Sequence, residues 1–296
     1  MIPRILHYCF GMSRDFGGRP WSLMHYVGLQ SAIDRIAPSR VHFYCEHEPR
    51  GPWWSLTRDR VNVIPIKAPR SIYGNPVVHY AHRADIVRLE KLIEYGGIYL
   101  DADVCVHRSF DDLLSHPVVL AQERADSDRG LCNAVILAEP GARFLLRWHA
   151  EYQSFRSRGK DDFWIEHSVQ APSRLARQFP DELCVLPQTA FYWPSWDPEG
   201  IRLMFESTER LALTGSYATH LWESMTWERY LKDLVPGRVR AIDSNFHRWA
   251  RPYLEALPDD YGAPSSLERA RRRLRSAIGR QIPPGLKGRL KQMLAP

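Results

Sequence analysis

The chain has 296 residues, 44% of them hydrophobic, which is enough to bury a sizeable core as one large domain or as a domain with appendages. This composition excludes a disordered or fibrous protein. No apolar run approaches the ~18 residues of a transmembrane helix, and no basic segment followed by a long apolar stretch opens the chain. We therefore expect neither an integral membrane protein nor a secreted precursor.

The net charge of +6 belongs to the C-terminal end of the chain. Residues 265–296 contain nine Lys or Arg and one acidic residue, so the rest of the chain is slightly acidic. The five cysteines are scattered without a Cys-x-x-Cys pair, which argues against a disulfide framework and a zinc site. This cysteine usage predicts a protein of the reducing cytoplasm.

Predicted strands and helices alternate in the N-terminal part of the chain. Pro38 follows the first predicted helix, and Gly96 follows the second at a position that favours a left-handed cap. This order predicts an α/β layer with a mostly parallel sheet. The predicted strands are 2–10, 41–45 and 61–66, and the predicted helices are 23–36 and 78–95.

Two carboxylates follow an apolar run directly after the second of these helices. Asp101 and Asp103 are separated only by Ala102, and on an extended strand they would leave the same face, roughly 7 Å apart at their Cα atoms. Carboxylates held in this way suit a hard divalent cation that also binds phosphates and water. Asp-x-Asp alone is equally the pattern of an ordinary acidic turn, so the flanking residues must decide.

Asp85 and Arg88 share a face of the helix at 78–95, because they lie three residues apart. They are either a surface salt bridge of little consequence or part of a site in which the planar guanidinium binds a diphosphate. Their spacing does not choose between the two.

The rest of the chain is less regular. We predict a short helix at 110–114, strands at 118–122 and 132–138, and an amphipathic helix after Pro140. Residues 160–198 are rich in Pro and Trp and predict long aromatic-lined loops with short helices, where binding residues concentrate.

The tail at 265–296 has an apolar stripe beside its arginines. This pattern is compatible with an interfacial helix that binds anionic lipid and with a solvated basic tail.

Several of these segments together resemble the family 32 glycosyltransferases, which transfer sugars in capsule, lipopolysaccharide and mannan synthesis. The match is specific in its central block, residues 84–103, and less specific toward the two ends of the matched region. The resemblance spans about 2–227 and rests on Ile2-Pro3-Arg4-Ile5-Leu6-His7, on Ala84-Asp85-Ile86-Val87-Arg88, on Tyr95-Gly96-Gly97-Ile98-Tyr99-Leu100-Asp101-Ala102-Asp103, on Asn133, and on Tyr217-Ala218-Thr219-His220 with Trp227.

The resemblance implies a GT-A fold at 1–262, with a Rossmann-like mixed sheet, and a basic tail at 263–296. It implies a UDP- or GDP-linked sugar donor, a saccharide or glycolipid acceptor, and Mn²⁺ or Mg²⁺ on the donor diphosphate. The implied metal ligands are Asp101, Asp103 and His220, the implied catalytic residues are Asp103, Arg88 and Asn133, and the implied donor-binding residues are His7, Tyr8, Asp85, Arg88, Asp101 and Trp227.

Two features qualify the resemblance. The family often has a Thr-Gly-Pro turn where this chain has Ile165 to Val169, so Glu166 and His167 are only candidates for acceptor contacts. As isolated residues, His220 is compatible with a structural histidine and Trp227 with the core. The resemblance also implies retention of the anomeric configuration, and the lack of an evident general base is compatible with it.

Two other function classes are open from the sequence. In a phosphohydrolase Asp101 would be the nucleophile, but that class expects the motif on an early first strand and a lysine downstream, where only Lys160 lies between Asp103 and Gly200. A non-enzymatic protein could bind nucleic acid or anionic lipid through the basic tail. No nucleic-acid motif is present, so we expect no nucleic-acid partner and a cytoplasmic enzyme attached peripherally to the inner face of the membrane.

Overall fold

The computed structural model describes residues 1–124 and 130–264. Residues 1–261 form one compact unit, and the remaining residues form a second unit of which only 262–264 are described. The predicted basic helix at 265–296 therefore lies outside the described residues. Within those described, no helix is both long and apolar enough to cross a membrane.

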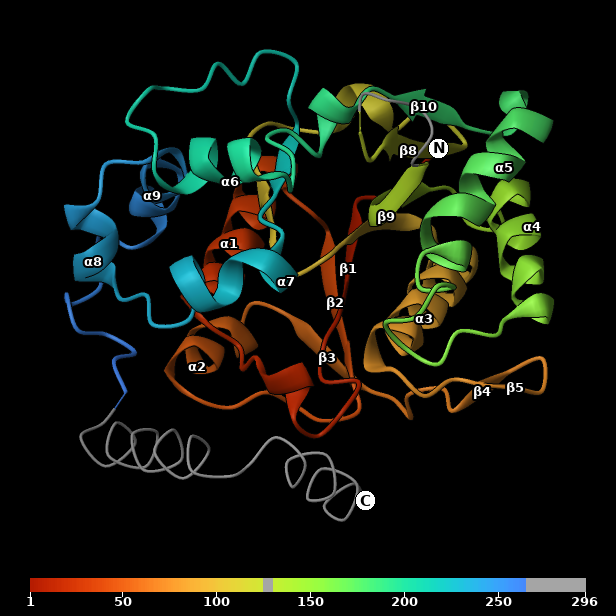
Figure 1. Cartoon of the computed structure of the whole chain (residues 1–296), viewed down its shortest axis with the longest axis horizontal. Helices are drawn as coiled ribbons and strands as arrows, with labels where there is room; N and C mark the ends of the chain where they lie inside the picture. The colour runs from red at the N-terminus through yellow and green to blue at the C-terminus, as the bar shows by residue number, and fades with distance from the viewer. Residues whose placement is uncertain (125–129, 265–296) are drawn as a thin grey trace. The chain divides into compact units, whose positions relative to one another are not determined.

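A seven-stranded mixed sheet runs through the compact unit (Figure 1). Its strand order is β10-β8-β9-β6-β1-β2-β3. The four neighbouring strands β3, β2, β1 and β6 are parallel to one another. The next strand, β9, is antiparallel to both β6 and β8, and β10 is parallel to β8. The sheet strands are β1 (Ile5–Cys9), β2 (Arg40–Cys45), β3 (Asn62–Pro65), β6 (Gly97–Leu100), β8 (Val118–Gln122), β9 (Leu131–Ala138) and β10 (Cys184–Leu186).

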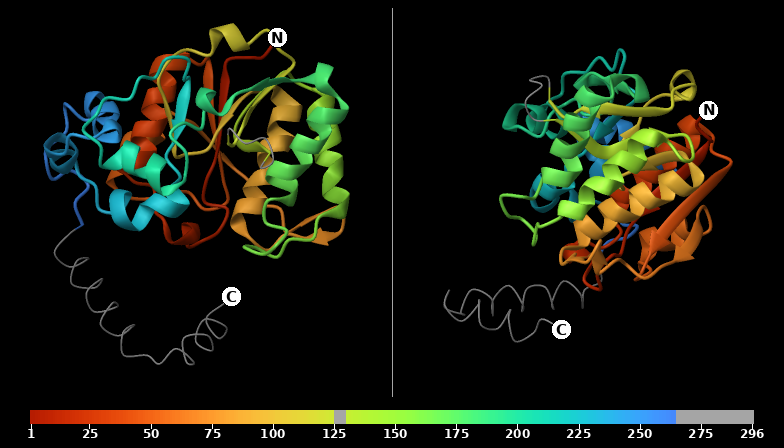
Figure 2. Two further views of the ribbon diagram at one scale, coloured as in Figure 1. Left: turned by 45° about the horizontal axis from the view of Figure 1, so that its top comes forward. Right: turned by 90° about the vertical axis from the view of Figure 1, so that its right-hand side faces the viewer.

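Helices cover both faces of this sheet (Figures 1 and 2). α1 (Leu23–Ile36) packs in the larger hydrophobic core on one face. α3 (Tyr80–Tyr95), α4 (Arg143–Glu151) and α5 (Ala171–Gln178) pack in a second core on the other face. A separate antiparallel pair, β7 (Val104–Val106) with β11 (Ala218–His220), lies next to the carboxyl end of β6.

The remaining elements are short. The helices are α2 (Pro52–Arg58), α6 (Pro198–Phe205), α7 (Glu223–Thr226), α8 (Pro236–Ala241) and α9 (Asn245–Ala250), and β4 (Ser71–Ile72) and β5 (Asn75–Pro76) form a hairpin. Single 3₁₀ turns are η1 (Phe16–Gly18), η2 (Asp111–Leu113), η3 (Tyr152–Ser154), η5 (Pro180–Glu182), η6 (Gln188–Ala190) and η8 (Arg251–Tyr253), and η4 (Glu166–Gln170) and η7 (Trp227–Leu231) are π-helical.

Two glycines connect α3 to the central strand β6. Gly96 caps α3 at the predicted position, with its N–H donating to the Leu92 carbonyl, but its φ of 62° and ψ of −170° are not the left-handed helical conformation that was predicted. Gly97 has a φ of 112°, and a Cβ there would lie 2.5 Å from the Ile5 carbonyl oxygen of the neighbouring strand. Gly97 therefore lets the start of β6 lie close against β1.

The predicted strands and helices of the N-terminal part are present, with ends shifted by a few residues. The prediction of a mostly parallel sheet was incomplete, because β9 runs antiparallel between β6 and β8. Between the predicted strands 41–45 and 61–66, where no helix is predicted, the Trp53-Trp54 pair lies in α2 with both rings buried, and Pro52 is the first helical residue.

Candidate active site

The 101–103 motif forms the turn that follows β6. The strand ends at Leu100, and the Val104 N–H donates to the Asp101 carbonyl at 3.1 Å. The carboxylates therefore leave a turn and not the extended strand that their spacing predicts. This turn is fixed to β9, because the Asp101 N–H donates to the Ala134 carbonyl at 2.8 Å.

A second segment, at the end of β11, closes on Asp103. His220 pairs with Val104 across the two-stranded sheet, and its Nε2 lies 3.1 Å from Asp103 Oδ1. The Glu223 N–H donates to Asp103 Oδ2 at 2.8 Å. Trp222, just before Glu223, has a φ of 55°, a left-handed conformation that is uncommon for residues other than glycine. This turn directs the Glu223 N–H at the carboxylate.

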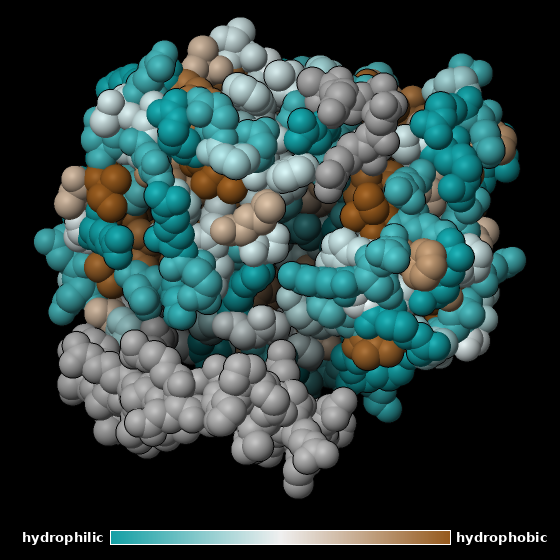
Figure 3. All heavy atoms as spheres, in the orientation of Figure 1, coloured by the Kyte–Doolittle hydropathy of each residue, from teal (hydrophilic) through white to brown (hydrophobic). Residues whose placement is uncertain are grey.

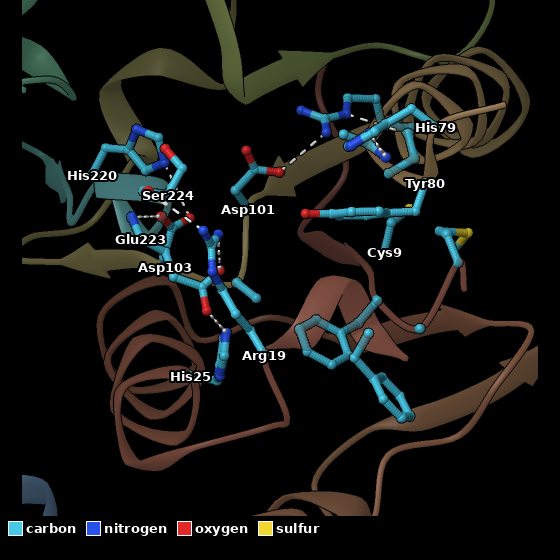
Figure 4. Close-up of a pocket in the computed structure, with 18 of the residues that line it drawn as sticks. Cys9, Arg19, His25, His79, Tyr80, Asp101, Asp103, His220, Glu223 and Ser224 are labelled. Atoms are coloured by element: carbon cyan, nitrogen blue, oxygen red, sulfur yellow. Dashed lines mark hydrogen bonds and ion pairs between the residues drawn. The ribbon is translucent and has the colours of Figure 1, made fainter. Parts of the chain in front are cut away.

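One donor atom each of Asp101, Asp103 and His220 lies within 4.8 Å of the other two (Figure 4). Burial raises the pKa of Asp103, but His220 and the Glu223 N–H outweigh it and lower the pKa to about 2. Burial raises the pKa of Asp101 against the lowering effect of Arg88, and Asp103 adds to the rise. Burial lowers the pKa of His220, but Asp103 outweighs it and the net pKa is raised.

These three donors fit a divalent metal ion. Two carboxylates and an imidazole converge from two segments, and such oxygen-rich sets bind Mg²⁺, while the added imidazole favours Mn²⁺. Asp101, Asp103 and His220 are therefore the residues that would hold the ion.

Arg88 connects this cluster to α3 and β9. Its guanidinium contacts Asp85 Oδ1 at 3.1 Å and Asp101 Oδ1 at 3.2 Å, and donates to the Asn133 carbonyl at 2.7 Å. It also stacks over the Tyr99 ring at 4.3 Å, and the Tyr99 hydroxyl donates to the same Asp101 oxygen at 2.6 Å. Arg88 is only 5% exposed, so its pair with Asp85 is part of a buried network and not a surface salt bridge.

Both carboxylate oxygens of Asp85 contact side chains of the same network. Asn133 Nδ2 donates to its Oδ1 at 2.8 Å, and His82 Nδ1 lies 3.2 Å from its Oδ2. The other nitrogen of His82 lies 2.9 Å from the Ser157 hydroxyl. Burial raises the pKa of Asp85, but Arg88 and His82 outweigh it, so the net pKa is lowered. Asp85 is therefore a buried, ionised carboxylate.

Two pockets meet at this network, on the face of the molecule that is hollowed near its centre in Figure 3. The β1 pocket, about 250 Å³, begins at the end of β1 and is lined by Phe10, Phe16, Arg19 and Tyr80 among others. The β9 pocket, about 550 Å³, is lined among others by Asp85, Asn133, Trp164, Trp196 and Trp222. Arg88, Asp101 and His220 belong to the lining of both pockets.

Comparison with known proteins assigns this arrangement to a family. Residues 25–120 match the model of the glycosyltransferase sugar-binding region containing a DXD motif. Glucan organizing enzyme 1 of Cryptococcus neoformans is 36% identical over 271 residues, which cover 88% of this chain and 73% of that protein. The chain belongs to the DXD glycosyltransferases.

Other relatives are more distant. Mouse lactosylceramide 4-alpha-galactosyltransferase is 24% identical over 82% of this chain and 66% of its own length. The apo crystal structure of mouse xyloside xylosyltransferase 1 matches with a TM-score of 0.42 at 14% identity, over 65% of this chain and 87% of that one. The expectations of a glycosyltransferase and of a mixed α/β fold with flanking helices are confirmed, and a transferase replaces the phosphohydrolase and the binding protein as the function class.

The structure of this DXD glycosyltransferase brings six of the predicted site residues to one place. All six line at least one of the two pockets: Asp85, Arg88, Asp101, Asp103, Asn133 and His220.

Three predicted donor-binding residues lie elsewhere. His7 is fully buried inside the sheet, where it contacts the Tyr44 hydroxyl and the Gly96 carbonyl. Tyr8 and Trp227 lie in the hydrophobic core that contains α1. None of the three lines either pocket. In β1 the residue that lines the pocket is Cys9, which follows His7 and Tyr8, because the β1 pocket begins where the strand ends.

The candidates for acceptor contacts are also displaced. Glu166 pairs with Arg156 at the surface, and buried His167 approaches the Glu151 carbonyl. Ile165 and Ser168 line the β9 pocket in their place.

Two residues that line the β1 pocket, Arg19 and Glu223, had no signal in the sequence. Arg19 of the β1–α1 loop and Glu223 of α7 contact each other at 3.7 Å across the rim of the β1 pocket. Glu223 also lies 3.2 Å from His25 Nε2. Lys160 and Trp164 lie in the segment 160–198, whose composition predicted aromatic-lined binding loops, and both line the two pockets. A local pattern cannot show residues such as Arg19 and Glu223, because the fold alone places them here.

Proposed function

We propose that this enzyme transfers a sugar from a UDP- or GDP-linked donor to a hydroxyl group of a saccharide or glycolipid, in the synthesis of a surface polysaccharide or glycoconjugate of bacterial type. The observation that carries the proposal is the position of Asp101, Asp103 and His220. They lie where two pockets of different chemistry meet, so that a diphosphate on one side and its sugar on the other would adjoin the same metal ion.

The β1 pocket has the chemistry of a nucleoside diphosphate site. Phe10, Phe16 and Tyr80 supply aromatic surface for a base, and Arg19 supplies a planar cation for phosphate oxygens. The β9 pocket has the chemistry of a sugar site. The Asp85 carboxylate and the Asn133 amide line it and can bond sugar hydroxyls, and indole rings beside them can stack on a sugar ring.

A bound Mn²⁺ or Mg²⁺ would neutralise the negative charge that develops on the departing diphosphate. The residues of the chain contribute the rest. Arg88 places a fixed positive charge beside Asp101, in a buried network that needs no reorganisation during the reaction. Asp85 and Asn133 orient the sugar, and Asn133 holds Asp85 in place.

We further propose that the anomeric configuration is retained, with the proton of the acceptor hydroxyl passing to the departing diphosphate. Asp85, which lines the β9 pocket, is already bound by Arg88, Asn133 and His82, which disfavours a role as general base. Glu123 also lines that pocket, and the Trp196 indole donates to it at 3.2 Å. NMR of the product would report the anomer, and an inverted product would contradict retention and direct attention to Glu123.

The experiment that tests the main proposal is a donor screen. Purified enzyme is incubated with UDP- and GDP-sugars in Mn²⁺, in Mg²⁺ and in excess chelator, and release of the nucleoside diphosphate is measured. We expect release from at least one donor with metal and none with chelator. Release from simple phosphomonoesters instead, or full activity in chelator, would overturn the proposal.

For the cell, we propose a cytoplasmic enzyme that binds the inner face of the membrane through the basic residues of 265–296. The charge of that segment supports this, because nine basic residues and one acidic residue favour anionic lipid. We propose no nucleic-acid partner.

A further inference from the structure

The basic side chains around the two pockets differ in whether an acidic side chain is already paired with them. Arg88 is bound by two carboxylates, those of Asp85 and Asp101. Arg19 faces Glu223, and His220 faces Asp103. A diphosphate that loses its sugar gains negative charge, and each of these groups shares its own charge with an acidic side chain as well as with the diphosphate.

Lys160 is different. It lines both the β1 pocket and the β9 pocket, so it lies where the phosphate on one side would join the sugar on the other. Within 1–124 and 130–264, its ammonium group makes no hydrogen bond or ion pair by the usual distance criteria, and its side chain is exposed at the pocket mouth. Its charge is therefore available to a ligand.

The field of Lys160 reaches into the β1 pocket. His79 lines that pocket, and its pKa is lowered to about 4 by burial first, with His82 and Lys160 adding to the effect. His79 is thus neutral near pH 7 and does not compete with Lys160 for an anion.

The loop that carries Lys160 is anchored on both sides of it. On one side, Ser157 is 1% exposed, and its hydroxyl lies 2.9 Å from His82 Nε2 and 2.8 Å from Asp161 Oδ1. On the other, the Asp161 carboxylate accepts the N–H of Arg158 at 2.6 Å and of Phe163 at 3.1 Å.

This anchor connects the loop to the buried network of the site. Through His82, Ser157 is tied to Asp85. Gly159 next to Lys160 has a φ of 140°, and a Cβ at this position would lie 3.5 Å from the His79 ring. These contacts fix the backbone on both sides of Lys160 beside the buried network.

We infer that Lys160 binds the phosphate group from which the sugar departs. The inference rests on the proposed donor. In the transfer, the acceptor oxygen bonds to the anomeric carbon while the bond from that carbon to the phosphate oxygen breaks. The electron pair stays on the phosphate oxygen, and the acceptor proton passes to the released diphosphate. The Lys160 ammonium stabilises the oxygen that gains this charge.

The test compares Lys160→Gln, Lys160→Arg and the control Lys67→Gln, which changes an exposed lysine outside both pockets. Calorimetry measures the affinity for UDP, GDP, uridine and guanosine in Mn²⁺. Because a charge-assisted contact is lost, we expect Lys160→Gln to weaken diphosphate binding about 10- to 100-fold and to leave nucleoside binding unchanged. Lys160→Arg should recover most of the affinity, and Lys67→Gln should match the wild type.

Turnover supplies a second readout. For the donor that the wild type hydrolyses, Lys160→Gln should lower kcat as well as affinity. Unchanged diphosphate affinity and kcat in Lys160→Gln would overturn the inference, and so would an equal loss of nucleoside and diphosphate affinity, which would indicate a disturbed loop. If the wild type binds neither UDP nor GDP, the proposed donor fails first and the role of Lys160 fails with it.

Discussion

Both carboxylate oxygens of Asp103 accept contacts from one short segment. His220 reaches Oδ1 and the Glu223 N–H reaches Oδ2, so the side chain is oriented before any metal binds. Asparagine has nearly the same shape but carries an N–H₂ group on one side. That group would face either the Glu223 N–H, which is a donor, or His220 Nε2, and the negative charge would be lost in both cases.

For Asp103→Asn we therefore expect transfer and donor hydrolysis to fall by more than about 100-fold, since charge stabilisation at the reacting group is lost. The unpaired donors cost about 1–3 kcal/mol of stability, so the chain still folds. Donor hydrolysis in Mn²⁺ and circular dichroism check the two parts. Asp34→Asn, at an exposed position of α1, is the control, and wild-type turnover in Asp103→Asn would contradict the metal assignment.

Asp85 makes a separate prediction about stability. Replacing it by Asn leaves buried Arg88 with Asp101 as its remaining carboxylate, and breaking a buried pair costs about 3 kcal/mol. Urea unfolding measures this cost. The matched control is Glu199→Gln, which breaks an exposed pair with Arg202 and should cost less than about 1 kcal/mol.

The pH dependence of Asp85→Asn follows from the lowered pKa of Asp85 in the folded chain. A carboxyl with a lowered folded pKa stabilises the protein above its unfolded pKa and loses that share as the pH falls through the folded value. The gap in stability between wild type and variant should therefore shrink as the solution is acidified. A gap that does not change with pH would show that charge is not its cause.

The parts of the site that sequence could predict are those that lie close together in the chain. Asp101 with Asp103, and Asp85 with Arg88, were candidates from their spacing in the chain, and the family resemblance of the flanking residues favoured a site over a turn or a salt bridge. His220 lies more than a hundred residues away and reaches Asp103 only through the β7–β11 pairing, so only the family resemblance indicated it. The positions of Glu223 and Lys160 depend on turns for which the sequence has no comparable pattern.

At the scale of elements, α1 lies close against the turn that carries the motif. A Cβ on Gly28 would lie 2.8 Å from the Val104 carbonyl oxygen and 3.0 Å from that of Ala102. Gly28 has ordinary helical geometry, so space and not backbone freedom requires the glycine. The helix thus fixes the turn by direct contact with its backbone.

Gly28→Ala tests this contact. Alanine favours the helix by about 1 kcal/mol, but overpacking against backbone atoms costs about 1–3 kcal/mol and moves the turn. We expect a small net loss in urea unfolding and a clear loss of donor hydrolysis. Asp34→Ala, on the exposed face of α1, should be neutral or stabilising with full activity. Full activity in Gly28→Ala would show that α1 does not position the site.

Element prediction succeeded where a local signal was strong. α1 spans the predicted 23–36, because Ser22 caps its start and Ala37 takes the left-handed conformation before Pro38. α2 was missed because a helix of seven residues is too short to show a periodic apolar stripe. The antiparallel direction of β9 was not predicted either, because the direction of a strand depends on its partners and not on its own residues.

At the scale of the whole molecule, the two halves of the sheet carry different parts of the site. The parallel strand β1 ends at the β1 pocket, and antiparallel β9 supplies Asn133 to the β9 pocket. The β6 strand lies between them and ends in the motif. A donor that spans both pockets would therefore pass over the 101–103 turn. This position explains why that one turn carries both carboxylates of the proposed metal site.

The acceptor side of the reaction leads to a prediction about residues 265–296. If the acceptor is a glycolipid, binding to the membrane brings the enzyme close to it, and each basic residue near an anionic surface adds about 1 kcal/mol to the free energy of membrane binding. We expect the full chain to sediment with vesicles that contain phosphatidylglycerol and not with neutral vesicles. Deleting 265–296 should abolish sedimentation and leave donor hydrolysis within about twofold, because the metal-binding and pocket residues that the structure describes lie before it. Changing Arg271, Arg272 and Arg273 to Gln should give an intermediate, salt-sensitive result. Equal sedimentation after deletion would place any membrane contact in the compact unit instead.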